Sequence, residues 1–106
     1  MSGGRVRLCA VDEMEDGTAR RFVVGGTAIA LVRCGGGFHA VADTCSHEDY
    51  SLAEGEVFAE ECEIECWKHG STFSLLTGEP LTLPATKPVA VYEVAVEQGA
   101  VHVVPP

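Results

Sequence analysis

Two short motifs, each with one cysteine and one histidine, constrain this chain more than any other feature. The first is Cys45-Ser46-His47 and the second is Cys66-Trp67-Lys68-His69. In an extended segment, side chains two residues apart point to the same side, so one loop can present both ligands of the first motif. The second motif needs a turn, and Gly70 directly after it suits one. Together the motifs offer four soft or borderline metal ligands from two loops.

This order of ligands resembles the cluster-binding signature of the Rieske family, in which two His replace two of the Cys around a 2Fe–2S centre. The resemblance implies one 2Fe–2S cluster, with the two cysteines on the inner iron and the two histidines on the outer one. It extends to His69-Gly70-Ser71 and Thr77-Gly78-Glu79-Pro80, and its specific part lies in residues 43–88. The ligands that it implies are Cys45, His47, Cys66 and His69.

Other interpretations of the cysteines and histidines stay open. Zinc sites also use Cys and His at short spacing, although zinc fingers usually pair Cys with Cys and His with His. A disulfide between the two motif cysteines would leave both histidines unexplained. Cys62 is the one rival ligand, but Glu61-Cys62-Glu63 has the alternation of a strand. We expect Cys9 and Cys34 to be small core residues, and His39 to be a surface or hydrogen-bonded residue.

Several residues near the ligands differ from those of respiratory Rieske proteins. Those proteins have a disulfide across the cluster, at places where this chain has Tyr50 and Lys68. High-potential members also have a Ser and a Tyr whose hydroxyls bind cluster sulfur; this chain keeps Ser71 but has Phe73 in place of the Tyr. The missing groups predict a potential in the lower half of the Rieske range. A Pro-containing loop covers the cluster in the family, and residues 83–88 are similar to it in place, although a linker stiffened by two Pro is the alternative. The expected surroundings of the cluster are Tyr50, Lys68, Gly70, Ser71, Phe73 and Pro84.

The rest of the sequence favours short strands and turns, because Val, Thr, Gly and Pro are frequent. Residues 27–34 are apolar enough to be buried on both faces, and Gly35-Gly36-Gly37 predicts a hairpin turn after them. With the resemblance, this predicts an all-β Rieske fold: an antiparallel β-sandwich framework, one domain over 1–106, with an inserted cluster-binding subdomain over 43–80. The predicted strands are 6–11, 18–24, 27–34, 38–42, 56–59, 63–66, 72–76, 89–96 and 100–104.

The net charge of −9 is unevenly distributed, since residues 43–65 hold many acids and no Lys or Arg. Nucleic-acid phosphates require basic contacts, so a nucleic-acid partner is not expected. The acids either solubilise the surface or attract basic partners. No stretch approaches the roughly 20 apolar residues of a membrane span, and no signal peptide is visible, so we expect a cytoplasmic protein. The acids in residues 43–65 are Asp43, Glu48, Asp49, Glu54, Glu56, Glu60, Glu61, Glu63 and Glu65.

No arrangement of acid, base and nucleophile indicates a catalytic site, so we predict an electron carrier and not an enzyme. The resemblance implies a soluble, monomeric Rieske-type ferredoxin that passes one electron from a flavin-dependent ferredoxin reductase to a terminal oxygenase or a similar acceptor. One alternative is a non-catalytic subunit or accessory protein of a complex such as iron–sulfur assembly, because residues 47–52 resemble ferredoxins of that setting. A zinc-binding interaction domain is the other alternative.

Overall fold

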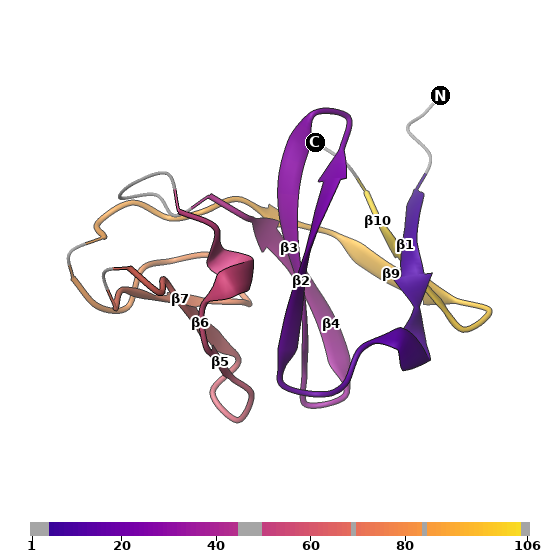
Figure 1. Ribbon diagram of the computed structural model, residues 1–106, viewed down its shortest axis with the longest axis horizontal. Coiled ribbons are helices and arrows are strands. Elements are labelled where there is room, and N and C mark those ends of the chain that lie inside the picture. The colour runs from indigo at the N-terminus through magenta and orange to yellow at the C-terminus, as the bar shows by residue number, and fades with distance from the viewer. Residues whose placement is uncertain (1–4, 45–49, 69, 84, 105–106) are drawn as a thin grey trace.

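A computed structural model describes residues 5–44, 50–68, 70–83 and 85–104. In this part of the chain, antiparallel strands form three sheets, which lie side by side along the long axis of the molecule (Figure 1). The predicted all-β class is confirmed. The elements are β1 (Val6–Ala10), η1 (Val11–Glu13), β2 (Thr18–Val24), β3 (Thr27–Cys34), β4 (Gly37–Ala42), η2 (Leu52–Glu54), β5 (Val57–Phe58), β6 (Glu63–Glu65), β7 (Thr72–Ser74), β8 (Val91–Tyr92), β9 (Val94–Glu97) and β10 (Ala100–Val103).

Two of the sheets form the framework. One has the order β2-β3-β4-β8 and the other β1-β10-β9. Strand β3 is the centre of the framework, because alternate side chains belong to two different cores. Ile29 and Leu31 pack with Val101 and Val103 in the core shared with the β1-β10-β9 sheet.

The third sheet, with the order β5-β6-β7, packs on the other face of β3. Ala30 and Val32 from β3 share a second core with Ile64 and Phe73 of the small sheet. The strands of this sheet are only two or three residues long. The small sheet therefore depends on the framework for much of its buried apolar surface.

The structure corrects one predicted strand and the interpretation of Cys62. Residues 89–96 do not form one strand, because the chain passes from one framework sheet to the other: β8 pairs with β4, whereas β9 pairs with β10. Cys62 does not lie in a strand but in the turn before β6, with φ of +58°. Over the described residues, both helices are single short 3-10 turns, so none has the length and apolarity of a membrane-crossing helix.

Candidate metal centre

The second ligand motif lies in a tight loop that follows β6. Cys66 is fully buried, and its backbone N–H donates to the carbonyl oxygen of Ser71 at 2.7 Å. The N–H of Gly70 donates to the carbonyl oxygen of Cys66 at 2.9 Å, and Gly70 has φ of +75°. Glycine adopts this left-handed conformation without a steric penalty. The turn predicted at Gly70 is therefore confirmed, and the loop closes on backbone hydrogen bonds.

The first ligand motif lies between β4 and η2, and the structure describes the base of its loop. Thr44 and Ser51 form an isolated antiparallel bridge, and the N–H of Leu52 donates to the carbonyl oxygen of Asp43. Both ligand loops are thus closed at the base by hydrogen bonds of the backbone.

Of the four predicted ligands, Cys66 is the one that the structure describes. The assignment of the complete ligand set therefore stays a prediction, as does the role of Pro84, which also lies outside the described residues. The ligands outside the described residues are Cys45, His47 and His69.

Asp43 fixes the base of the first loop. Its side chain is buried, and the carboxylate accepts hydrogen bonds from Nε of Arg21 at 3.1 Å and from the backbone N–H of Ala53 at 2.9 Å. A buried carboxylate needs such partners. The sequence places Asp43 among the surface acids, and the structure corrects this: Asp43 is an internal brace between β2 and η2.

Three alternate residues from the second loop and β7 point into the core behind Cys66. Ser71, Phe73 and Leu75 are all buried. The Oγ of Ser71 accepts the backbone N–H of Ala85 at 3.1 Å, which holds the segment after residue 80 beside the loop. A hydroxyl that accepts one hydrogen bond still has its own proton to donate. Phe73 has no such proton.

Tyr50 and Lys68 connect the two ligand loops without a covalent bond. The Nζ atom of Lys68 lies 5.9 Å from the centroid of the Tyr50 ring, which is within the range of a cation–π contact. Tyr50 also meets Trp67 edge to face, with the ring centroids 5.2 Å apart. The places at which the respiratory proteins have a disulfide are therefore in contact here through aromatic and cationic side chains.

Apolar side chains are exposed beside the second loop. Trp67 is 49% exposed, Leu81 48% and Leu83 77%. The Leu81 N–H donates to the carbonyl oxygen of Thr72, which places this segment next to the start of β7. Exposed apolar groups clustered at one end of a small domain indicate a contact surface. We call Trp67, Leu81 and Leu83 the apolar rim.

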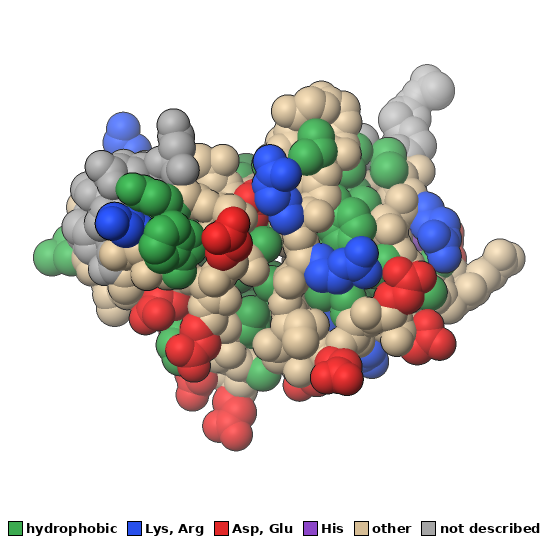
Figure 2. Space-filling model, viewed as in Figure 1, with side chains coloured by type: hydrophobic (Ala, Val, Ile, Leu, Met, Phe, Trp, Pro, Cys, Tyr) green, Lys and Arg blue, Asp and Glu red, His purple; other side chains and the backbone are tan. Residues whose placement is uncertain are grey.

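Some of the exposed acids that the structure describes lie away from the apolar rim. Glu60 and Glu61 are in the turn between β5 and β6. Because β6 runs from that turn toward Cys66, the two acids are at the opposite end of the small sheet from the second ligand loop. Figure 2 shows acidic side chains along the lower edge of the molecule, under the strands β5–β7 of Figure 1. Glu48 and Asp49 lie outside the described residues.

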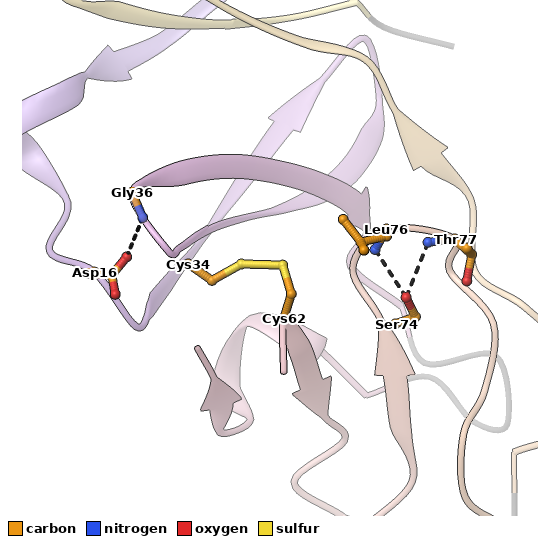
Figure 3. The surroundings of a disulfide bond; sticks show 7 residues. All are labelled: Asp16, Cys34, Gly36, Cys62, Ser74, Leu76 and Thr77. Carbon is orange, nitrogen blue, oxygen red and sulfur yellow. Dashed lines mark hydrogen bonds between the residues drawn. A yellow bond between two sulfur atoms is a disulfide. The ribbon is translucent and has the colours of Figure 1, made fainter. Parts of the chain in front are cut away.

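A disulfide joins Cys34, at the end of β3, to Cys62, in the turn before β6 (Figure 3). Cys34 is a buried core residue, as predicted. Its disulfide is not predicted from the sequence. Neither spacing nor a local motif indicates it, because 28 positions of sequence separate the partners. Cys9 is buried, as predicted.

The sequence matches known proteins along most of its length. The family described as Rieske [2Fe-2S] domain matches residues 4–93. Ferredoxin CarAc of Metapseudomonas resinovorans is 41% identical over 99 residues, which span 92% of this chain and 91% of the relative.

The fold is also similar to solved ferredoxin structures along most of the chain. The ferredoxin of carbazole 1,9a-dioxygenase from Nocardioides aromaticivorans IC177 superposes with a TM-score of 0.93 at 35% identity, covering 96% of this chain and 98% of that one. The ferredoxin in a solved complex of reduced oxygenase and oxidized ferredoxin in carbazole 1,9a-dioxygenase has a TM-score of 0.86 at 41% identity, covering 92% of this chain and 99% of that one.

Proposed function

This chain belongs to the Rieske [2Fe-2S] family, and we propose on that basis that it carries one electron from a flavin-dependent ferredoxin reductase to a terminal oxygenase. The two relatives with 41% identity are both ferredoxins, and one of them was solved with its oxygenase. The family and these relatives imply a Rieske 2Fe–2S cluster as the cofactor. The chain works as an electron carrier and leaves the oxidation of substrate to the partner.

The predicted ligands would hold the cluster through two thiolates and two imidazoles. The donor set suits a 2Fe–2S centre of this type, and the one ligand described, Cys66, lies buried in a loop whose backbone is already closed. The cluster would supply the group that accepts and releases one electron. Ser71 would stabilise added negative charge there, because the Oγ that accepts the Ala85 N–H can still donate its own proton.

One observation carries the proposed role in transfer: the buried Cys66 is followed directly by the exposed residues Trp67 and Lys68. A redox centre on this loop would be shielded on the side of the core and would come close to the surface at the apolar rim. An acceptor that covers the rim would therefore bring its own redox centre near the cluster. The rim, rather than the acids of the β5–β6 turn, is the proposed docking surface.

The whole chain would act as one domain over residues 1–106, with residues 43–80 as the cluster-binding part. The ligand loops and the small sheet belong to that part. Strands of the framework precede and follow it in the sequence. A carrier that shuttles between two partners needs no permanent subunit, so we expect a monomer. We propose the cytoplasm as its location.

Reconstitution tests the proposal. The purified protein is mixed with a ferredoxin reductase and with the terminal oxygenase of a related dioxygenase system, and electron transfer to the oxygenase is followed by stopped-flow absorption. Trp67→Ala should slow this step at unchanged cluster content. Leu76→Ala is the matched control, because Leu76 is 65% exposed but follows β7 at the end of the sheet far from the rim. Equal rates for both variants would remove the rim as the docking surface. Elution of the native protein only within a larger complex would contradict the free carrier.

A further inference from the structure

We propose that Cys34, His39 and Cys62 form a second metal site, which takes Zn²⁺ or a similar thiolate-preferring cation when the Cys34–Cys62 disulfide is reduced. This site is separate from the predicted cluster ligands and does not depend on the proposed electron transfer. It would bind the framework to the small sheet.

The three residues converge from separate parts of the fold. Cys34 ends β3, His39 lies in β4, and Cys62 lies in the turn before β6. Their sulfur and imidazole nitrogen atoms all lie within 4.8 Å of one another. Three ligand atoms this close together could hold one metal ion once the disulfide between the two sulfur atoms is reduced.

The backbone of Cys62 positions the sulfur of this residue. Its φ of +58° is in the left-handed region, which residues other than glycine rarely adopt. This conformation turns the Cys62 sulfur toward Cys34, as Figure 3 shows. Gln98 in the β9–β10 turn has a similar φ of +52°, so the conformation places the Cys62 sulfur but does not by itself mark a functional site.

The chemistry of the three groups suits zinc. Two thiolates and one neutral imidazole leave a fourth position of the tetrahedron for water. Burial lowers the pKa of His39, which favours the neutral imidazole with a lone pair for the metal.

The charges around the site favour a cation. Glu61 and Glu63 flank Cys62 in the sequence, and residues 43–65 include no Lys or Arg. Arg33 precedes Cys34 on β3, so its side chain points to the opposite face of the strand, where Nη1 donates to the carbonyl oxygens of Val11 at 3.1 Å and Met14 at 2.6 Å. A positive ion would therefore meet two thiolates and nearby acids without a competing side-chain cation from these segments.

The site opens when the Cys34–Cys62 disulfide is reduced. A dithiol transfers its two thiol hydrogens to the two sulfur atoms, or a phosphine takes the oxygen of one water molecule, whose two protons go to the sulfur atoms. The reductant leaves as its disulfide or phosphine oxide. Zn²⁺ then displaces both thiol protons and forms two Zn–S bonds. Oxidised protein has the disulfide, and reduced protein has the metal site.

Zinc binding to the cluster-loaded protein tests the proposal. After anaerobic reduction by a phosphine and a thiol count, Zn²⁺ affinity is measured by competition with a chromogenic chelator, and iron is measured in the same samples. Reduced protein should bind one zinc and keep about two irons, and zinc-edge X-ray absorption should show sulfur at about 2.3 Å. Cys62→Ser and His39→Gln should each weaken binding at least about 100-fold, since loss of an outer-shell partner already costs 10–100-fold.

Cys9→Ser is the matched control, because Cys9 is a buried cysteine in the other core and should leave the affinity unchanged. His39→Gln keeps both cysteines and so tests the site without loss of the disulfide. The proposal fails if reduced protein binds no zinc, if the disulfide form binds it equally, or if both variants keep the full affinity. It also fails if each zinc displaces iron, because the cluster ligands would then be the zinc site.

Discussion

The framework and the small β5-β6-β7 sheet are stabilised in different ways. In the framework, β2 and β3 pair from Thr18 to Val24 with an unbroken register, and β3 pairs with β4 over six further positions. The small sheet has two residue pairs between β5 and β6 and three between β6 and β7. A short sheet has few backbone hydrogen bonds and little apolar surface of its own.

The contacts around the small sheet compensate for this. Asp43 braces η2, which precedes the small sheet, toward β2, the Cys34–Cys62 disulfide joins the turn before β6 to β3, and Ser71 holds the segment after β7. The comparison shows that the β2-β3-β4 part of the framework is held by regular pairing, whereas the ligand-bearing part is held by single long-range contacts. Removal of one contact should therefore have a local effect in the small sheet.

Loss of a cluster ligand should have the largest effect. We expect Cys66→Ala to abolish the visible absorption of the cluster, because a thiolate ligand is missing. Amide hydrogen exchange should accelerate in β5–β7 and stay slow in β2 and β3. Cys9→Ala is the control and should keep the cluster. A normal cluster in Cys66→Ala, with loss of the cluster in Cys62→Ala, would show that the ligand assignment is wrong.

A cavity in the framework should have the next largest effect. Leu31 is fully buried, and Leu31→Ala should lower the free energy of unfolding by about 2–5 kcal/mol. Denaturant unfolding followed by circular dichroism measures this change. The exposed Leu76 is the control, and Leu76→Ala should stay within about 0.5 kcal/mol. The folded fraction of Leu31→Ala should still contain cluster. Loss of the cluster from folded protein would indicate that the two regions are not separable in this way.

The reduction potential should respond to two buried positions behind Cys66. Phe73→Tyr should raise the midpoint potential and Ser71→Ala should lower it, because a hydroxyl donor stabilises the added negative charge. The unmodified protein should lie in the lower half of the range from about −150 to +300 mV, with little change between pH 6 and 8. Protein-film voltammetry measures all three proteins. A midpoint above about +150 mV at pH 7 would show that the missing donor and disulfide do not control the potential.

The acids of the β5–β6 turn should have the smallest effect. They are exposed and distant from the second ligand loop, so Glu60→Lys with Glu61→Lys should change the rate of reduction by the reductase only modestly. The change should fade as salt rises, because charges are screened beyond roughly 10 Å at 0.1 M. Stopped-flow rates across a salt series check this. If the double variant slowed electron transfer to the oxygenase more than Trp67→Ala does, the docking surface for the oxygenase would lie at this turn and not at the rim.

The sequence predicts the elements with a regular pattern. Residues 18–24 and 27–34 are strands with the predicted bounds, because apolar periodicity and the glycine turns after them are local signals. The crossing between β8 and β9 has no local signal, since both strands continue one alternating run. The brace of Asp43 and the Cys34–Cys62 pair also depend on contacts between distant segments. Part of the metal centre is therefore visible in the motifs, whereas the contacts that support it are not.

The position of Trp67 has an optical consequence. It is the single tryptophan of the sequence, it directly follows Cys66, and its ring lies at the surface against Tyr50. A nearby iron–sulfur centre absorbs in the range in which tryptophan emits, so it quenches this fluorescence by energy transfer. Emission from the unmodified protein should therefore rise when the cluster is lost and change again when a partner covers the ring. The fluorescence of Trp67 should therefore report both the presence of the cluster and the binding of a partner.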